Sequence, residues 1–402
     1  MVICGKIQSI GVFISVVVFL PLMTHAQSEV KIYQDADAYM RQEKYDLAVD
    51  AFQYISDLPD VKYKSTISAL LSKKYRYRSI DSYLEFEAEK GKDPLYYYWL
   101  GKIYLRRNIL SKASEYLNQF LQMSEGMNKL DSYRQEAQFK LQFVNAAETS
   151  MAVTPLESPI NSNFAEMSGV LFENETRLLF ASDRLEEGKF DIYVTEKGPY
   201  GWNTPKVISQ SPVGVDHLNL LYVRGTFMYY NQQSNQLNEM EIGAKDWKVL
   251  SAVETLDLAG VQHIYMNKYK TRLIFSKPTE ENGLEIFESL KLRSTGEWME
   301  PVLISPQVSS RYNEDYPYLT DDNKRLYFSS DRPGGLGKRD IYYSEFDDVE
   351  NVWGPPINAG IPINTVDDDF DFRVSSDNEA VFSSDRIEST GDYDLFVLQV
   401  KK

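Results

Sequence analysis

A phrase that recurs about every fifty residues constrains the fold of this 402-residue chain more than any other feature. The best copy reads Leu-Tyr-Phe-Ser-Ser-Asp-Arg at 326–332, with Asp-Ile-Tyr following at 340–342. Similar text occupies 178–184 and 381–386, and two weaker copies lie between them. The last aromatic residues of the five copies are 50, 45, 53 and 54 positions apart, and they are Phe180, Tyr230, Phe275, Phe328 and Phe382. A repeat of this length predicts a circular or stacked array of units.

Each unit contains the parts of a propeller blade. After Pro155, short runs rich in Tyr, Phe, Ile and Val alternate with Gly, Pro, Asn and Asp, as strands alternate with turns. The best copy predicts strands at 316–319, 325–330 and 340–345, and a last strand after Trp353. Four short antiparallel strands in a unit of this length are typical of a propeller blade. The tryptophans expected to mark the fourth strand are Trp202, Trp247, Trp298 and Trp353.

The fifth unit ends without a fourth strand. The text at 155–162, Pro-Leu-Glu-Ser-Pro-Ile-Asn-Ser, is similar to the text at 356–364 in the fourth unit. A strand at 153–161 is therefore expected to complete the last blade and to remove the open edge of the ring. This predicts an all-β five-bladed propeller over 151–402.

Residues 27–150 are expected to be all-α, so the chain is predicted to be a multidomain α+β protein. Glycine and proline are rare there, and apolar residues recur at three and four. Small or aliphatic residues recur at intervals of 32 and 33, at Ala48, Ile80 and Ala113. The pattern resembles the tetratricopeptide repeat, in which small residues let paired helices approach closely; a generic helical hairpin bundle is the alternative. The aromatic residues at 96–99 are expected to be mostly core, with one or two rings facing a groove.

Residues 1–26 are expected to be a signal peptide that is cleaved after Ala26. Lys6 precedes an apolar run at 10–23, and Thr-His-Ala then places small residues where a signal peptidase reads. A membrane anchor is the alternative for this run. The only cysteine, Cys4, precedes the run, so the mature chain would have no disulfide and no thiolate metal site. The formal net charge of −16, with no basic stripe, argues against nucleic acid as a partner.

The repeated Ser-Asp-Arg and Asp-Ile-Tyr text resembles the WD40-like repeat of the periplasmic propeller of the Tol system and of many Bacteroidota envelope proteins. The order of signal, helices and blades with a Pro-Gly-Gly-Leu-Gly loop at 333–337 is similar to propeller proteins that commonly end in an OmpA-like domain, one of them associated with type IX secretion. An OmpA-like domain and a lipid-attachment cysteine are not found in this sequence. The resemblance implies a non-enzymatic periplasmic or outer-membrane-associated protein without a membrane span. Its partners would be envelope proteins or peptides, bound at a helical groove and a propeller face.

The Asp and Arg residues of the phrase are expected to build the scaffold. Asp183, Asp331 and Asp385 lie where a strand ends, and a short carboxylate there can accept backbone N–H bonds. Each neighbouring arginine is expected to reach the aspartate that opens the next strand. The expected pairs are Arg184 with Asp191, Arg332 with Asp340, and Arg386 with Asp394. A rim of calcium or basic-ligand sites is the alternative, and recurrence at fixed offsets favours the scaffold.

Few residues are available for catalysis. His217 and His263 are the only histidines after the signal, too few for a three-histidine metal site, and no metal or cofactor is expected. Both lie where an innermost strand begins. Acidic residues follow in the same stretch of blades four and five, which keeps a paired-carboxylate glycosidase or a glycan-binding propeller as the alternative function. The candidate carboxylates are Glu314, Asp315, Asp369 and Asp371.

Blades two and three have lost the phrase. Ser-Asp-Arg has become Asn231-Gln232-Gln233 in one and Ser276-Lys277-Pro278 in the other. Sequence drift is one interpretation. The other is that this sector contacts a partner, with Gln232 and Lys277 as binding residues. The glycine-rich loop at 333–337 lacks the Gly-Lys-Ser/Thr that would make it a phosphate cradle, so a permissive hairpin loop is expected.

Overall fold

The computed structural model describes residues 25–55, 59–72, 74, 93–148, 150–208, 218–223, 226–231, 234–242, 247–253, 256–376 and 379–400. The chain forms two compact units, Met1–Lys90 and Gly91–Lys402. The last helices belong to the same compact unit as the propeller, and the domain boundary predicted at 150 stays a prediction. Of the helices that the structure describes, none is long and apolar enough to cross a membrane.

The first unit is helical. Its elements are α1 (His25–Arg41), α2 (Tyr45–Phe52), η1 (Gln53–Ile55) and α3 (Pro59–Leu71). Ala48 and Phe52 on α2 are fully buried, so the small and large residues of the predicted repeat do lie in the core. Asp37 on α1 forms an ion pair with Lys64 on α3. Ile80, the second residue of the predicted period, lies outside the described residues, and the tetratricopeptide assignment stays a prediction.

The second unit begins with α5 (Pro94–Arg106), α6 (Leu110–Met123), η3 (Asn128–Leu130) and α7 (Asp131–Asn145). Asp93 caps α5 by accepting a hydrogen bond from the Leu95 N–H at 2.9 Å, and Pro94 occupies the first helical position. A Cβ atom on Gly101 would lie 2.6 Å from the Leu117 side chain, so only glycine allows α5 and α6 to approach this closely. All four aromatic residues at 96–99 are buried and form core.

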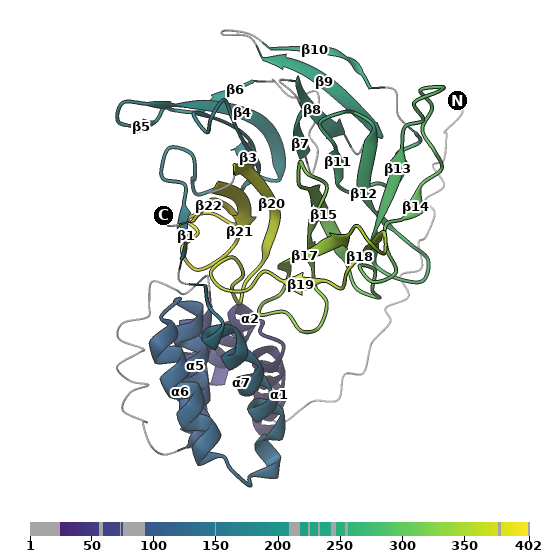
Figure 1. Ribbon diagram of the computed structural model, residues 1–402. Coiled ribbons are helices and arrows are strands. Elements are labelled where there is room, and N and C mark those ends of the chain that lie inside the picture. Colours follow the sequence, from purple (N-terminus) through teal and green to yellow (C-terminus); the bar gives the residue numbers. More distant parts are fainter. Residues whose placement is uncertain are drawn as a thin grey trace, which may run out of the picture. The chain divides into compact units, whose positions relative to one another are not determined.

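Five antiparallel sheets form the propeller that follows (Figure 1). Blade 1 contains β2 (Glu166–Phe172), β3 (Arg177–Glu186), β4 (Lys189–Gly198), β5 (Gly201–Trp202) and β6 (Lys206–Val207). Blade 2 contains β7 (Leu218–Val223), β8 (Thr226–Asn231), β9 (Gln236–Ile242) and β10 (Trp247–Ala252). Blade 3 contains β11 (Ile264–Met266), β12 (Arg272–Pro278), β13 (Leu284–Leu290) and β14 (Val302–Leu303). Blade 4 contains β15 (Glu314–Leu319), β16 (Arg325–Ser330), β17 (Asp340–Asp347), β18 (Val352–Trp353) and β19 (Ile357–Asn358).

Blade 5 is completed by the strand that enters the propeller first. Its order is β1 (Met151–Pro155), β22 (Asp394–Val400), β21 (Glu379–Ser384) and β20 (Asp369–Ser376), and β1 pairs antiparallel with β22. The closing strand predicted from the sequence is therefore present, although it lies at 151–155 instead of 153–161. The remainder of the predicted segment turns away, and Asn161 exchanges two side-chain hydrogen bonds of 2.9 Å with the backbone of Leu395. Asn364 holds Ile341 in the same way, which explains why the two stretches of text are similar.

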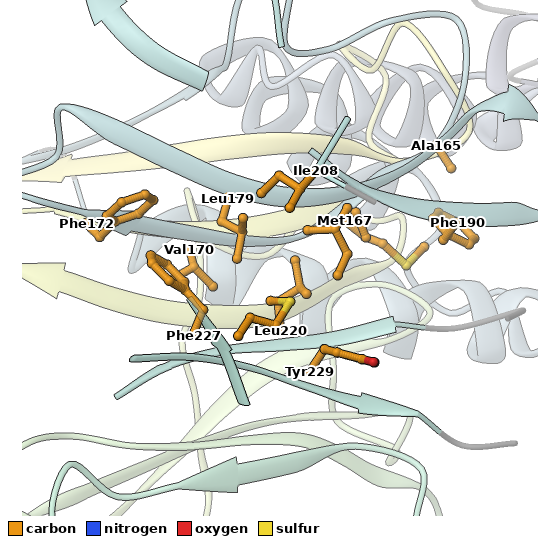
Figure 2. Packing of buried hydrophobic residues seen from close by; sticks show 13 residues of the cluster. Ala165, Met167, Val170, Phe172, Leu179, Phe190, Ile208, Leu220, Phe227 and Tyr229 are labelled. Atoms are coloured by element: carbon orange, nitrogen blue, oxygen red, sulfur yellow. The ribbon is translucent and has the colours of Figure 1, made fainter. Parts of the chain in front are cut away.

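Apolar side chains between neighbouring blades hold the ring together. Figure 2 shows one such cluster, in which Val170 and Phe172 of blade 1 lie beside Leu220 and Phe227 of blade 2. The rings of Phe172 and Phe227 meet edge to face at 4.7 Å. Burial of each large apolar side chain stabilises the fold by about 1.5–3 kcal/mol. The cluster between two blades therefore acts as a hydrophobic core that holds them together.

The glycine-rich loop of blade 4 packs against the helices α5 and α7. Leu105 of α5 and Val144 of α7 share an apolar cluster with Leu336 of the loop. Beside it, Arg106 and Asp367 form a buried ion pair with an N–O distance of 2.7 Å. The interpretation of this loop as a simple permissive hairpin was therefore incomplete, since it also positions α5 and α7.

The closing strand generates a test of the ring. Val153 packs its side chain into the core of blade 5, whereas the neighbouring Thr154 is exposed. We expect Val153→Asp to lower the free energy of unfolding by about 2 kcal/mol or more, because it places a charge against apolar residues. Thr154→Asp is the matched control and should change it by less than about 0.5 kcal/mol. Urea unfolding followed by tryptophan fluorescence measures both, and equal stabilities would show that β1 does not close the ring.

Candidate functional site

A buried carboxylate where the innermost strand begins is the centre of a network in blades 1, 4 and 5. Glu166, Glu314 and Asp369 have no exposed surface. Each is paired with the arginine of the repeated phrase in its own blade. The pairs, with N–O distances of 2.9, 2.9 and 2.5 Å, are Arg184 with Glu166, Arg332 with Glu314, and Arg386 with Asp369.

Blade 4 shows the rest of this network. The Ser310 N–H and hydroxyl donate to Glu314 at 2.9 and 2.6 Å, and the Ser330 hydroxyl donates to it at 3.0 Å. The Arg332 guanidinium also donates to the Val308 carbonyl at 2.5 Å. Blades 1 and 5 repeat these contacts with Ser162, Ser182 and Ile160, and with Thr365, Ser384 and Ile363.

The predicted partner of the arginines was therefore wrong. Asp340 instead accepts the backbone N–H groups of Leu336 and Gly337 at 2.5 and 3.1 Å. Asp394 accepts those of Thr390 and Gly391 at 2.7 and 3.1 Å. The corresponding Asp191 pairs across the sheet with Ser182. Asp340 and Asp394 thus shape the loops before the third strands of their blades, while the arginines hold the innermost strands.

The neighbouring aspartates of the phrase accept backbone N–H bonds, as expected for short carboxylates at strand ends. Their partners are the residues just before each buried carboxylate. The bonds, of 2.8, 2.8 and 2.7 Å, run from Ala165 to Asp183, from Asn313 to Asp331, and from Asp368 to Asp385. Each repeated phrase thus fixes the start of its own innermost strand twice, through the aspartate and through the arginine.

Blade 3 lacks this network. Lys277 makes no hydrogen bond or ion pair with any residue that the structure describes. In blade 2, His217 and Gln232 lie outside the described residues, so their predicted roles stay predictions. The interpretation of blades 2 and 3 as a partner-binding sector also stays a prediction.

A second polar cluster lies at the starts of the innermost strands of blades 3 and 4. His263 Nδ1 lies 2.8 Å from Asp315 Oδ1, and both residues are buried. The Ser276 hydroxyl and the Tyr316 N–H donate to the same oxygen. Burial disfavours the charged form of Asp315, but the charge and hydrogen bond of His263, with those of Ser276 and Tyr316, hold its pKa below the usual range. The His263 ring stacks on Tyr316 with centroids 3.6 Å apart.

In blades 1, 4 and 5, a backbone bulge changes the direction of one side chain on the innermost strand. Ser168, Tyr316 and Asp371 each lie two residues after a buried carboxylate, and their φ angles are 55°, 50° and 56°. The strand register shifts at all three places, and such bulges re-aim side chains. Asp371 uses one oxygen to accept a 2.8 Å hydrogen bond from Arg373 Nε. Its other oxygen, Oδ2, is buried and has no hydrogen-bond partner among the described residues.

The four candidate carboxylates thus divide into two pairs. Glu314 and Asp369 belong to the scaffold network, because they are fully buried and neutralised by arginines, so they are not available for acid–base chemistry. Asp315 and Asp371 lie on the neighbouring innermost strands β15 and β20, and they are bonded to His263 and Arg373 respectively. The structure does not bring all four together as a catalytic set.

A cavity lies at the other ends of the innermost strands. It has a volume of about 900 Å³ and is lined by all five blades, and we call it the axial cavity. Its aromatic walls are Phe172, Tyr222, Tyr265 and Tyr318. Its charged residues are Glu173, Glu175, Lys268, Asp321, Asp322 and Arg373. The sequence analysis drew attention to the acidic residues at the strand starts and did not single out the residues that line this cavity.

The charges of the axial cavity are partly paired. Lys268 forms a 2.9 Å ion pair with Asp321. Hydrogen bonds from the Thr320 hydroxyl and the Lys324 N–H hold the pKa of Asp322 below its usual range, so it stays ionised. Arg373 donates to Asp371 and to the Leu220 carbonyl, and its Nη2 makes no hydrogen bond with any described residue. Within the described part of the chain, no group of three His, Cys, Asp or Glu side chains could hold a metal ion.

Comparisons with known proteins assign neither a family nor an activity to this chain. No family model matches the chain, and no curated protein matches it. An α-L-arabinofuranosidase from Lactobacillus brevis is 12% identical over 60% of this chain and 91% of its own, with a TM-score of 0.38. TolB from Acinetobacter baumannii is 12% identical over 60% and 55%, with a TM-score of 0.29. A GH43 endo-arabinanase from Bacillus licheniformis is 11% identical over 59% and 94%, with a TM-score of 0.35.

The expectation of a non-enzymatic protein is corrected by these comparisons. The solved structures to which this chain is similar include arabinofuranosidases and an arabinanase as well as TolB. At identities of 9–12% neither group assigns an activity to this chain. The fold therefore does not decide whether the chain is an enzyme.

The buried network predicts that neutralising one of its carboxylates strongly destabilises the fold. Glu314→Gln keeps the size of the side chain but leaves Arg332 buried without a counter-charge. We expect the free energy of unfolding to fall by about 3 kcal/mol. Glu345→Gln, which removes an exposed ion pair with Arg325, is the control and should cost less than about 1 kcal/mol. If both variants unfold at the same urea concentration, the network does not stabilise the blade.

The raised pKa of Asp340 makes the stability of the fold depend on pH. Burial raises its pKa to about 7, although hydrogen bonds from Asn358 and the Leu336 N–H oppose the rise. Because this pKa exceeds the ordinary value of about 3.9, the folded protein binds more protons between these two pH values. The contribution of Asp340 to stability is therefore greatest near pH 4 and falls as the pH rises through 7.

Thermal unfolding of the wild type and of Asp340→Asn between pH 4 and pH 8 tests this. The asparagine does not titrate, so the wild type should lose stability relative to the variant as the pH rises. A difference in melting temperature that is constant with pH would contradict the prediction.

Proposed function

We propose that this protein is an exported binding protein of the cell envelope, and that the axial cavity holds a positively charged segment of a protein partner. The axial cavity itself carries this proposal. Its volume is in the range of ligand sites, and its walls combine aromatic rings with a few charged groups, as binding sites do. Tyr222 on its wall is 39% exposed, so an aromatic surface is open to a partner.

The charge of the axial cavity favours a cationic partner. Four carboxylates and two cations line it. Glu175 makes no hydrogen bond or ion pair with any described residue, and Asp322 is bonded only within its own turn. The chain as a whole has a formal net charge of −16, which steers cations toward it. An extended segment with lysine or arginine side chains would match both the rim and the aromatic walls.

The cellular context rests on the sequence. The apolar run at 10–23 and the small residues before Gln27 support export. The resemblance to Bacteroidota envelope propellers supports a periplasmic or outer-membrane-associated complex, of which type IX secretion machinery is one candidate. The groove once expected on the helices has less support, because the aromatic residues at 96–99 are core.

A glycan is the second candidate ligand. The observation that favours it is Arg373, which lines the cavity and has one nitrogen, Nη2, that bonds to no described residue, since a guanidinium near a carboxylate such as Glu175 can bind sugar hydroxyls. Four aromatic residues in the wall are also suited to sugar rings. Hydrolysis would need a second carboxylate at a suitable distance from the bond to be cleaved.

Binding of defined probes separates the two candidates. We expect a fluorescent lysine-rich dodecapeptide to bind the full chain, and the double variant Glu175→Lys, Asp322→Lys to bind it at least tenfold more weakly, because both charges at the rim are reversed. Glu187→Lys, an exposed change in the loop after β3, is the control and should bind like the wild type.

Arabino-oligosaccharides are the second probe in the same titration. The glycan candidate replaces the peptide if these oligosaccharides bind and if Tyr222→Ala weakens their binding while the double variant Glu175→Lys, Asp322→Lys does not. If neither probe binds, or if all variants bind alike, the axial cavity is not the site of binding.

A further inference from the structure

The side chain of Arg373 reaches across the centre of the ring. Arg373 lies on β20 of blade 5, and its Nη1 donates a hydrogen bond to the carbonyl of Leu220 on β7 of blade 2. These two blades are not neighbours, because blade 1 packs against blade 5 on one side and against blade 2 on the other. Arg373 also lines the axial cavity, so its guanidinium lies across the inner end of that cavity.

The charged groups of the axial cavity lie at different depths. The side chains of Glu173 and Asp321, in the turns that form the mouth, are 57% and 69% exposed. The side chain of Arg373 is 12% exposed. Ser376 also lines the cavity at the end of β20, three positions after Arg373, which is a rise of about 10 Å along a strand. The cavity therefore has carboxylates at its mouth and a guanidinium about 10 Å further in.

This guanidinium has an unused donor. Its Nε donates to Asp371 at 2.8 Å and its Nη1 donates to Leu220, which fixes its orientation. Its Nη2 makes no hydrogen bond with any described residue, and it is not fully enclosed by protein atoms. The Tyr318 hydroxyl on the cavity wall is engaged, since it donates to the Val374 carbonyl at 2.9 Å. A group that enters the cavity can therefore accept a hydrogen bond from Nη2.

We propose that the axial cavity recognises the carboxy-terminal end of a protein segment, with the terminal carboxylate on Arg373. This inference rests on the function proposed above and adds which end of the partner enters. About three extended residues span the distance from the mouth to the guanidinium. A longer stretch cannot thread straight through the ring, because the Arg373 side chain lies across its centre.

Charge decides between the two ends of a chain. A terminal ammonium group has only donors and would be repelled by the guanidinium, whereas a terminal carboxylate accepts a charge-assisted hydrogen bond from it. Glu175 and Asp322 at the mouth favour lysine or arginine side chains that precede the last three residues. A small free anion lacks those cations, so the mouth would repel it without compensation.

One peptide in two forms tests this inference on the full chain. The peptide is a lysine-rich dodecapeptide that ends in three leucines and carries a fluorophore on its N-terminus, prepared as the free acid and as the C-terminal amide. We expect fluorescence anisotropy to show that the acid binds the wild type at least tenfold more tightly than the amide. Equal affinities would overturn this inference and leave the proposed function intact. If neither form binds, both are wrong.

Two variants assign the preference to Arg373. Arg373→Gln removes the charged donor, and we expect it to reduce the preference for the acid to less than twofold. Arg325→Gln is the matched control, because Arg325 is 41% exposed and is not among the residues that line the cavity, and it should keep the tenfold preference. A preference that persists in Arg373→Gln would overturn the inference. If this variant does not fold, the comparison of acid and amide on the wild type still decides.

Discussion

The pairing of a fully buried carboxylate with an arginine from the next hairpin strand is the interaction on which this propeller depends. In blades 1, 4 and 5 it joins the start of the innermost strand to the end of the second strand and to the segment that leads into the blade. A charge without its partner would be left in the core, which typically costs about 3–5 kcal/mol. The serines, the aspartate and the arginine of the phrase are therefore constrained together, and this is why the phrase recurs as a unit.

The same constraint separates the scaffold from the places where function can lie. Residues of types that often take part in catalysis or binding, such as Asp331 and Arg332, form hydrogen bonds within the blade instead. Residues two positions further along the innermost strand are re-aimed by the bulge, so Tyr316 contacts His263 and Phe370 of the neighbouring blades. The opposite ends of the innermost strands line the axial cavity. The innermost strands thus build the scaffold at their starts and the axial cavity at their ends.

Much of the fold could be predicted from the sequence because it follows from local periodicity. The spacing of the marker aromatic residues predicted the number of blades. The similarity of 155–162 to 356–364 indicated the closing strand, because the side chains of Asn161 and Asn364 make the same hydrogen bonds to the backbone of a neighbouring strand. The partner of Arg332 could not be found by proximity along the chain. Asp340 is eight residues away and Glu314 is eighteen, yet the antiparallel hairpin places Glu314 opposite Ser330 and so beside the arginine. The bulges and the docking of α5 on the loop at Leu336 also depend on tertiary packing that no single repeat contains.

A double-mutant cycle over Asp369 and Arg386 tests the central claim most directly, because these two side chains are 0% and 5% exposed and have no solvent to replace the lost partner. The free energy of unfolding would be measured for the wild type, Asp369→Asn, Arg386→Gln and the double variant. Our account predicts a coupling energy of about 2 kcal/mol or more, with the double variant less destabilised than the sum of the single changes. Additive effects, with a coupling below about 0.5 kcal/mol, would contradict it.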